Sequence, residues 1–202
     1  MKKHIYTIGY TAYPIRDFLS VLKNNRINCL IDVRSVPKSS YYVDYDSDNL
    51  KRVLKGANIL YRNYKDEFGA RQEDKSYYPN GYLDFGIFTN SQKFLSGVDK
   101  IDKAISMGYT VCLMCAEKDP INCHRAIMIS RKLDELGFEV THLLALEEKC
   151  SQKDIDNRLL DKYYPNRGQL SIFQEDNLSD EEAVRRCYIK QNKEIGFKLE
   201  DE

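Results

Sequence analysis

Tryptophan is absent from the 202-residue sequence, and so are a net charge and any long apolar run. Lys plus Arg and Asp plus Glu both total 31, so the charge balance gives no general electrostatic reason to expect DNA or RNA binding. A local basic cleft remains compatible with this neutral net charge. No apolar run of about 18 residues and no secretory leader are present, which predicts no membrane partner and a cytoplasmic location. The 42% hydrophobic and 31% charged residues indicate a globular domain.

The sequence does contain many cysteines and tyrosines, six and fifteen respectively. In a cytoplasmic protein thiols stay reduced, so the sequence predicts no disulfide framework. Tyrosine joins an apolar ring to a polar hydroxyl, so we expect several of these rings to line a half-hydrated cleft. The cysteines are Cys29, Cys112, Cys115, Cys123, Cys150 and Cys187.

Short apolar runs of strand length alternate with segments of helical period. The predicted strands are residues 4–10, 28–33, 59–64, 109–115 and 139–143, and the predicted helices are residues 14–25, 47–55, 90–107 and 122–136. This alternation predicts an α/β fold, a three-layer sandwich with a mostly parallel sheet and right-handed crossovers. His142, inside an apolar strand, is expected to be a hydrogen-bonded core residue rather than a ligand.

The pattern changes in two places. Residues 65–86 are polar and aromatic, which is typical of a long functional or disordered loop. Two charged amphipathic helices are predicted after about residue 150, at 151–163 and 179–193. We therefore expect an α/β domain over residues 1–148 and a helical C-terminal extension over residues 149–202 packed on it.

Chemically distinctive residues end three of the predicted strands. They are Tyr10 after the first strand, Asp32, Arg34 and Ser35 at the end of the second, and Cys115 and Glu117 at the end of the strand at 109–115. Carboxyl ends of parallel strands share one edge of a sheet, where ligands bind. The sequence therefore predicts one site there. Asp32 either contacts the ligand or orients Arg34, and Glu117 is either a general base or a solvated loop carboxylate.

The segment after residue 115 predicts an anion-binding helix start. Asn122 is a suitable N-cap, which places Cys123, His124 and Arg125 in the first turn, where free N–H groups and the helix dipole favour a thiolate. Cys123 is then a nucleophile or redox thiol, His124 an acid/base and Arg125 an anion clamp. The alternative is that Cys123 is a small buried residue and His124 an exposed one.

Cysteine spacing also raises a zinc site, since the sequence reads C-x2-C-x7-C-H from Cys112 to His124. Residues three apart on a strand point to opposite faces, so Cys112 and Cys115 cannot share one ion. We therefore expect no metal and no other cofactor. Cys115 and Cys123 remain candidates for a reversible thiol pair.

Four motifs, in this order, closely resemble the domain of unknown function 488 family. They are Thr7-Ile-Gly-Tyr10, Asp32-Val-Arg-Ser-Val-Pro37, Phe68-Gly-Ala-Arg71 and Leu113-Met-Cys-Ala-Glu-Lys-Asp-Pro-Ile-Asn-Cys-His-Arg125. The likeness covers residues 3–145, and residues 169–173 and 191–197 are similar to a tail of some members. It implies an α/β fold and the same motif residues, and it assigns no activity. Thr11 and Ala70 depart from the usual serine and glycine.

The Asp-Val-Arg motif also resembles rhodanese-like domains. Those domains, like cysteine phosphatases, close a cysteine loop on an arginine after five or fewer intervening residues. Here Cys115 precedes Arg125 by ten positions and Cys123 precedes it by two. The sequence therefore does not predict that mechanism.

The leading functional hypothesis is an enzyme, a hydrolase or transferase, acting on an anionic nucleotide or nucleic-acid-derived substrate. Basic and aromatic residues between 34 and 82 suit such a ligand, although a solvated loop has the same composition. The expected catalytic residues are Cys115, Glu117, Cys123 and His124, and the expected substrate-binding residues are Tyr10, Asp32, Arg34, Ser35, Arg71 and Arg125. The alternatives are a non-catalytic nucleotide or nucleic-acid sensor and a thiol-redox or sulfur-handling protein using Cys115 and Cys123. The expected partner is thus a phosphate-bearing small molecule or nucleic acid, with the oligomeric state left open.

Overall fold

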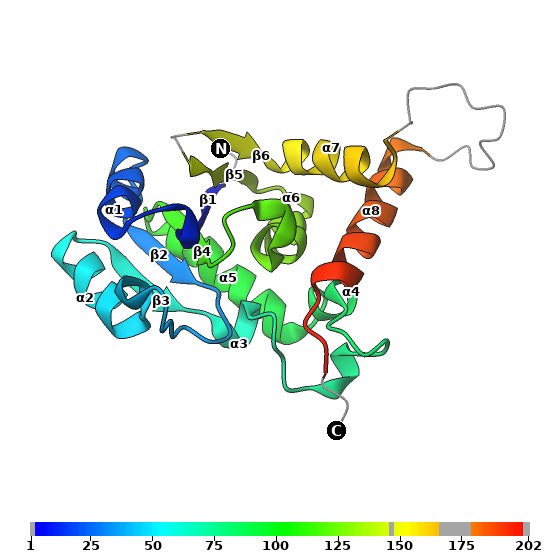
Figure 1. The fold of residues 1–202 in the computed structure, drawn as a ribbon, viewed down its shortest axis with the longest axis horizontal. Helices are drawn as coiled ribbons and strands as arrows, with labels where there is room; N and C mark the ends of the chain where they lie inside the picture. The colour runs from blue at the N-terminus through cyan, green and yellow to red at the C-terminus, as the bar shows by residue number, and fades with distance from the viewer. Residues whose placement is uncertain (1–2, 146–147, 166–178, 200–202) are drawn as a thin grey trace.

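A computed structural model describes residues 3–145, 148–165 and 179–199 of the chain. Its centre is a six-stranded sheet in the order β3-β2-β4-β1-β5-β6 (Figure 1). The strands are β1 (His4–Gly9), β2 (Cys29–Asp32), β3 (Leu60–Asn63), β4 (Val111–Cys115), β5 (Glu139–Leu143) and β6 (Lys149–Ser151). All neighbouring pairs are parallel except β5 and β6, which are antiparallel. The predicted α/β fold with a mostly parallel sheet is therefore confirmed.

The central strands are apolar because they are buried on both faces. Every residue of β2 and β4 is buried, as expected for parallel strands covered by helices on each side. The register sets Gly9 of β1 beside Cys115 of β4, and Asp32 of β2 beside Met114 of β4. Three adjacent strands thus end at one level, and the loops that follow them leave from the same edge.

The described helical segments cover both faces of the sheet. They are α1 (Ile15–Asn24), α2 (Ser47–Gly56), α3 (Lys65–Phe68), α4 (Phe85–Phe88), α5 (Gln92–Ser106), α6 (Arg131–Glu135), α7 (Gln152–Tyr163) and α8 (Asp180–Ile195), the 3₁₀ turns η1 (Tyr10–Ala12), η2 (Val43–Tyr45), η3 (Lys75–Tyr77) and η4 (Pro120–Asn122), and the π-helix η5 (Arg125–Ser130). Apolar residues of α1 and α2 form one buried cluster, and residues of α5, α6, α7 and α8 belong to a second. None of these helices combines the length and apolar character needed to cross a membrane.

Successive residues of β4 divide between these two clusters. Cys112 belongs to the cluster with α1 and α2, whereas Cys115 belongs to the other cluster. The prediction that the two cysteines face opposite sides of the sheet is confirmed.

The predicted helix at 122–136 begins later than expected. Asn122 ends the 3₁₀ turn η4 instead of capping the helix, and Cys123 is extended, with φ −131° and ψ 133°. The Cys123 carbonyl accepts the N–H groups of Ala126 and Ile127, so Cys123 takes the capping place assigned to Asn122. Pro120 favours the preceding turn because it has no N–H to donate and its φ is fixed.

Two further segments differ from the sequence-based expectation. The segment at 65–86 contains α3, η3 and the start of α4, and it buries Phe68, Leu83 and Phe85, so it is not a structureless loop. The strand β6 was not predicted, because three residues carry too little local pattern to show pairing with β5. The tail motif at residues 169–173 lies outside the described residues.

Candidate functional site

The site lies where β1, β2 and β4 end, and main-chain contacts hold their loops together. Thr11, after β1, donates its N–H and its hydroxyl to the carbonyl of Ala116, after β4, at 3.1 and 2.7 Å. The ring Nε2 of His124 lies 3.2 Å from the carbonyl of Val33, after β2. The expected convergence of three strand ends is therefore present, through backbone atoms that sequence patterns do not reveal.

Gly9 permits the closest of these approaches. A Cβ atom at this position would lie 1.9 Å from the Glu117 carbonyl oxygen and 3.1 Å from Nη2 of Arg125. The first distance is an outright clash with main chain, so a larger residue would push the β4 loop outward. Glycine at the end of β1 thus fixes how tightly the loop after β4 packs.

Four side chains meet at this edge, and we call Cys115, Glu117, Cys123 and His124 the Cys-Glu-Cys-His cluster. One ligand atom from each lies within 4.8 Å of the other three. The Cys123 thiol donates to Oε2 of Glu117 at 2.9 Å, and Sγ of Cys115 lies 3.7 Å from Nδ1 of His124. The cysteines and the histidine are buried, whereas Glu117 is exposed, so its carboxylate connects the cluster with solvent.

The contact with Val33 determines which nitrogen of His124 is free. A carbonyl oxygen only accepts hydrogen bonds, so Nε2 must carry a proton and donate it to Val33. Nδ1 then points toward Cys115 and can carry either a lone pair or a second proton. His124 is only 8% exposed, so the alternative of an exposed helix-start residue is wrong.

The two thiols of the cluster are electrostatically different. Burial alone would raise the pKa of Cys123, but hydrogen bonding from Cys115 and the charges of Arg125 and His124 lower it well below its usual value. The pKa of Cys115 is raised well above normal by its hydrogen bond to Cys123 and by burial. Although Glu117 as a residue is exposed, its carboxyl group lies against Cys123, and the burial of that group raises its pKa, with the nearby Cys123 charge adding to it. The arrangement favours one thiolate, at Cys123; in that form Cys123 accepts a hydrogen bond from the protonated Glu117 carboxyl instead of donating to it.

Arg125 lies under the cluster with none of its side chain exposed. Its Nη1 donates to the Glu117 carbonyl at 2.7 Å, and its backbone N–H donates to Sγ of Cys123 at 3.4 Å. Within the described part of the chain, Nε and Nη2 make no hydrogen bond. Unsatisfied buried donors are costly, so this guanidinium is suited to an acceptor that the protein itself does not supply.

A second buried guanidinium lies on the neighbouring strand. Arg34 forms a two-pronged ion pair with Asp32, at 2.9 Å from Nε and 2.6 Å from Nη2, and Tyr61 donates its hydroxyl to the same carboxylate at 2.8 Å. Asp32 therefore orients Arg34, which was one of its two predicted roles. The guanidinium lies 5.1 Å from the ring centre of Tyr10, and its Nη1 has no hydrogen-bond partner among the residues described.

The side chain of Ser35 contacts the main chain of Arg71. The Ser35 hydroxyl accepts the N–H of Arg71 at 2.9 Å. The Arg71 guanidinium lies over the ring of Phe197, with 4.7 Å between its central carbon and the ring centre. The structure thus places Ser35 at the edge with Arg34, and it directs the Arg71 side chain toward the C-terminal segment.

A surface cavity lies against the turn after β1, and no member of the Cys-Glu-Cys-His cluster lines it. The cavity has a volume of about 500 Å³ and is lined by residues 11–15 and 41–45. Tyr10 stacks on Tyr45 and meets the edge of Tyr42, while Tyr41 is 94% exposed. Tyr10 and Tyr45 are buried, so the aromatic wall of the cavity presents only the rings of Tyr41 and Tyr42 to solvent. Their position next to Thr11, which bonds Ala116, links the cavity to the loop after β4.

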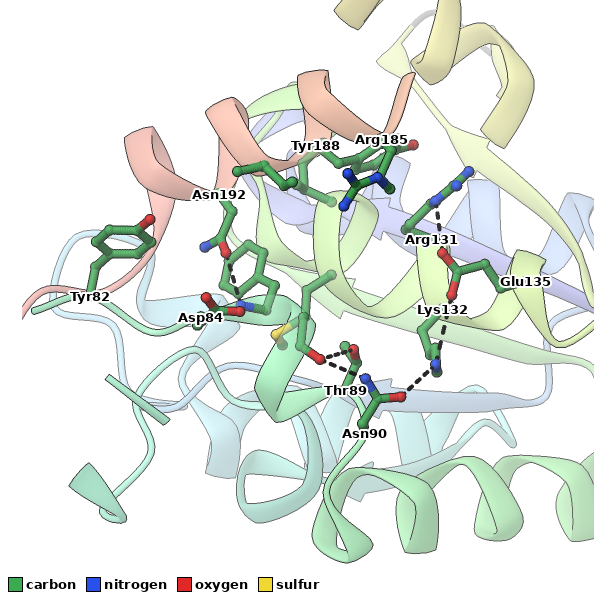
Figure 2. Close-up of a pocket in the computed structure, with 15 residues that line it drawn as sticks. Tyr82, Asp84, Thr89, Asn90, Arg131, Lys132, Glu135, Arg185, Tyr188 and Asn192 are labelled. Carbon is green, nitrogen blue, oxygen red and sulfur yellow. Dashed lines mark hydrogen bonds and ion pairs between the residues drawn. The ribbon is translucent and has the colours of Figure 1, made fainter. Parts of the chain in front are cut away.

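A second cavity of about 420 Å³ lies between α4, α6 and α8 (Figure 2). Its charged groups are largely paired with each other, because Arg131 and Lys132 both contact Glu135 and Lys132 also donates to Asn90. No member of the Cys-Glu-Cys-His cluster lines it. No residue pattern indicated this cavity, because its walls come from segments distant in the chain.

Cys29, Cys112 and Cys150, outside the cluster, are weaker acids than an ordinary thiol. Burial raises the pKa of Cys29 and of Cys150 to about 11 and raises that of Cys112 further still. Cys29, Cys150 and Cys187 were expected to be buried or inert, and the structure buries Cys29 and Cys187 and half-buries Cys150. Among Cys29, Cys112, Cys115, Cys123 and Cys150, the thiol with a lowered pKa is Cys123, in the segment after β4.

A family model described as domain of unknown function DUF488 matches residues 14–131, more than half of the chain. The match includes the whole cluster, Arg34 and Arg125, and it begins just after Tyr10. Comparisons with curated proteins and with solved structures found no match.

Proposed function

The chain belongs to the domain of unknown function DUF488 family, and we propose that it is an enzyme acting on an anionic nucleotide or nucleic-acid-derived substrate. One observation carries the proposal: the Cys-Glu-Cys-His cluster lies beside two buried guanidinium groups, Arg34 and Arg125, which retain unpaired N–H groups. Acid, base and nucleophile candidates are thereby placed next to donors for a negatively charged group.

The position in the fold supports a ligand site. Ligands of open parallel sheets bind beyond the carboxyl ends of the strands, and the cluster lies at that edge of β1, β2 and β4. Arg125 is held close to the thiols, so an anionic group drawn to it would approach Cys123 and Glu117. The buried guanidinium groups would then bind the charge while the cluster performs the chemistry.

The aromatic wall supports a nucleotide as the class of ligand. A cavity of about 500 Å³ is in the range of ligand pockets, and the exposed rings of Tyr41 and Tyr42 offer flat surfaces beside it. Nucleobases stack on such rings, with contributions of roughly 1–3 kcal/mol per base. The base would lie on the tyrosines and the phosphate would lie toward Arg34 and Arg125.

The direct test is binding and turnover with a panel of nucleotides and short single-stranded oligonucleotides. The wild-type chain is expected to show thermal stabilisation by at least one of them, with products detected by chromatography. Glu117→Gln should retain stabilisation and lose turnover, because it removes a proton acceptor and keeps the shape. Tyr41→Ala should weaken binding by roughly 5- to 150-fold, the equivalent of one stacked base.

Matched controls come from the opposite edge of the sheet. Glu139 begins β5, and the 75% exposed Met107 precedes β4, so both lie away from the cluster. Glu139→Gln and Met107→Ala should behave like wild type. The proposal is wrong if no nucleotide stabilises the wild-type chain, or if these controls lose as much binding and turnover as the site variants.

A thiol-redox function is the second candidate, and the short separation of Cys115 and Cys123 favours it, since their sulfur atoms lie within 4.8 Å. Mild oxidation would join them and remove two hydrogens, which lowers the intact mass by about 2 Da. That mass change, absent from a Cys123→Ser variant, would support this candidate. An unchanged wild-type mass would exclude it.

A further inference from the structure

We propose that Cys115, Cys123 and His124 bind a zinc-type divalent cation whose fourth coordination position opens toward Glu117. The inference names the cofactor of the site described above, and the chemical role that it gives the ion rests on the proposed function. The sequence-based expectation of no metal considered Cys112 as the partner of Cys115. The fold brings a different set of ligands together.

The distances fit tetrahedral coordination. Zinc–sulfur bonds of about 2.3 Å and zinc–nitrogen bonds of about 2.0 Å separate a sulfur ligand from a nitrogen ligand by roughly 3.5 Å. Sγ of Cys115 lies 3.7 Å from Nδ1 of His124, and Sγ of Cys123 lies within 4.8 Å of both. Two thiolates with an imidazole also form a donor set that suits zinc better than magnesium or calcium.

The groups around the three ligands are arranged as metal sites require. Metal-binding histidines usually donate their other ring nitrogen to a carbonyl or carboxylate, and His124 donates Nε2 to the Val33 carbonyl. This leaves Nδ1 facing Cys115. The backbone N–H of Arg125 donates to Sγ of Cys123, a contact that stabilises a thiolate. Both ligand orientations are thus fixed by the protein before any ion binds.

Charge balance supports the same assignment. Two thiolates neutralise a divalent cation, so an ion bound here leaves the positive charge of Arg125 free for an anionic substrate. Burying two thiols and an imidazole beside an arginine is unfavourable unless each polar atom has a partner. A shared ion supplies a bond to all three ligand atoms.

Glu117 is placed beside the ion rather than on it. Its Oε2 lies 2.9 Å from Sγ of Cys123, closer than the roughly 3.5 Å expected for two ligands of one tetrahedral ion. Its exposed side chain reaches the cluster from the solvent side, where the fourth position would lie. A glutamate next to a Cys/Cys/His zinc site is an arrangement used to activate water for attack on nucleobases.

The implied reaction is hydrolysis, with water as the only co-reactant. A water molecule at the fourth position gives one proton to Glu117, and its oxygen forms a bond to the electrophilic atom of the substrate. The bond to the leaving group breaks with its electron pair, and Glu117 passes the proton to that group. One water is added across the broken bond, and nothing is oxidised or reduced.

The first experiment measures the wild-type full chain. After chelation and dialysis under reducing conditions, zinc titration should show about one bound ion per chain. Cobalt(II) should give a thiolate-to-metal charge-transfer band and the intense visible bands of a tetrahedral ion. Added azide should shift the visible bands, because it enters an open position. Absence of zinc binding and of the charge-transfer band in folded wild-type protein would overturn the proposal.

The variants test the ligand set. Cys115→Ser, Cys123→Ser and His124→Asn should weaken zinc binding by more than the roughly 10- to 100-fold that loss of a supporting residue costs. Cys112→Ser is the matched control. Cys112 lies on the same strand as Cys115 but packs in the hydrophobic cluster with α1 and α2, on the opposite face of the sheet. Glu117→Gln should keep the ion and the cobalt spectrum. Loss of the ion in Glu117→Gln would make Glu117 a fourth ligand and overturn the open site.

Failure of this inference and failure of the proposed function give different results. Stoichiometric zinc without stabilisation by any nucleotide would retain the metal site and reject the substrate. Nucleotide binding and turnover in chelated protein would reject the chemical role of the ion and retain the substrate, while the zinc titration separately decides whether the site exists.

Discussion

His142 is buried in the middle of β5, and hydrogen bonds fix its protonation state. Gln152 donates its amide nitrogen to the Ala126 carbonyl and the Tyr188 hydroxyl, so the oxygen of Gln152 faces His142. Nε2 of His142 must therefore donate, and Nδ1 accepts from Thr7 at 2.7 Å. The expectation of a satisfied core histidine is confirmed, and the neutral ring fits without an unpaired group.

This arrangement predicts a loss of stability in mild acid. Burial, with the charge of Arg125 adding to it, lowers the pKa of His142 to about 4. The unfolded chain takes up the proton near pH 6.5, whereas the native chain does not until about pH 4. The stabilisation is complete above pH 6.5 and is lost as the pH falls to 4, by about 3 kcal/mol.

Urea unfolding at pH 7 and pH 5 measures this loss, and ring NMR signals of the three histidines give the pKa directly. A His142→Gln variant should be less stable at pH 7 and should depend less on pH in this range. A native His142 titrating near pH 6.5 would contradict the prediction.

At the scale of elements, apolar runs predicted the strands well and the loops poorly. The ends of β1, β2, β4 and β5 differ from their predicted ranges by at most two residues. The clearest case is β4, which is buried on both faces and is therefore an unbroken apolar run. The predicted start of the helix after β4 was wrong. Asn122 has good capping chemistry, but Pro120 starts a separate 3₁₀ turn that ends at Asn122. The same turn brings Cys123 and His124 to Cys115.

The candidate site was therefore predictable only in part. Parallel topology predicted that Tyr10, Arg34, Cys115 and Glu117 would lie at one edge, since this needs only strand order and direction. The Cys-Glu-Cys-His cluster depends on backbone geometry between residues 116 and 124, including the Val33 contact of His124. No residue pattern specifies that geometry. From the sequence, a zinc site could be judged only by the spacing of Cys112 and Cys115 on a regular strand.

The attachment of α7 and α8 to the sheet gives a prediction at this scale. Tyr188 of α8 donates to Asp156 at 2.8 Å and accepts from Gln152 of α7, which holds His142 of β5. Tyr188→Phe removes one hydrogen-bond partner from Asp156 and one from Gln152 in a buried network, so we expect a loss of about 1–3 kcal/mol in unfolding free energy.

Chemical denaturation measures that loss, with Tyr109→Phe, before β4, as the control for removing a tyrosine hydroxyl. Equal stability of Tyr188→Phe and Tyr109→Phe would show that the network does not hold the C-terminal helices in place. Zinc binding should survive Tyr188→Phe wherever the variant is folded, because its contacts lie outside the cluster.

At the scale of the whole molecule, the net charge is zero, and two buried arginines are the exception to an otherwise balanced charge distribution. The 31 basic and 31 acidic residues cancel, and many exposed charges form pairs such as Arg158 with Asp119. The buried guanidinium groups left with unpaired N–H groups in the described ranges are Arg34 and Arg125, both at the sheet edge. A broad basic surface, which long nucleic acids require, is not indicated by this balance.

The dependence of ligand binding on salt should reflect this distribution. If Arg34 and Arg125 supply most of the phosphate contacts, the plot of log affinity against log salt should have a slope no steeper than about −2. A mononucleotide and a short oligonucleotide carrying the same base should then bind with similar affinity, since further phosphates find few cations. Calorimetric titration between low and moderate salt measures both. A much steeper slope for the oligonucleotide would instead place an extended nucleic-acid surface on the protein, because each additional released counterion requires another phosphate contact.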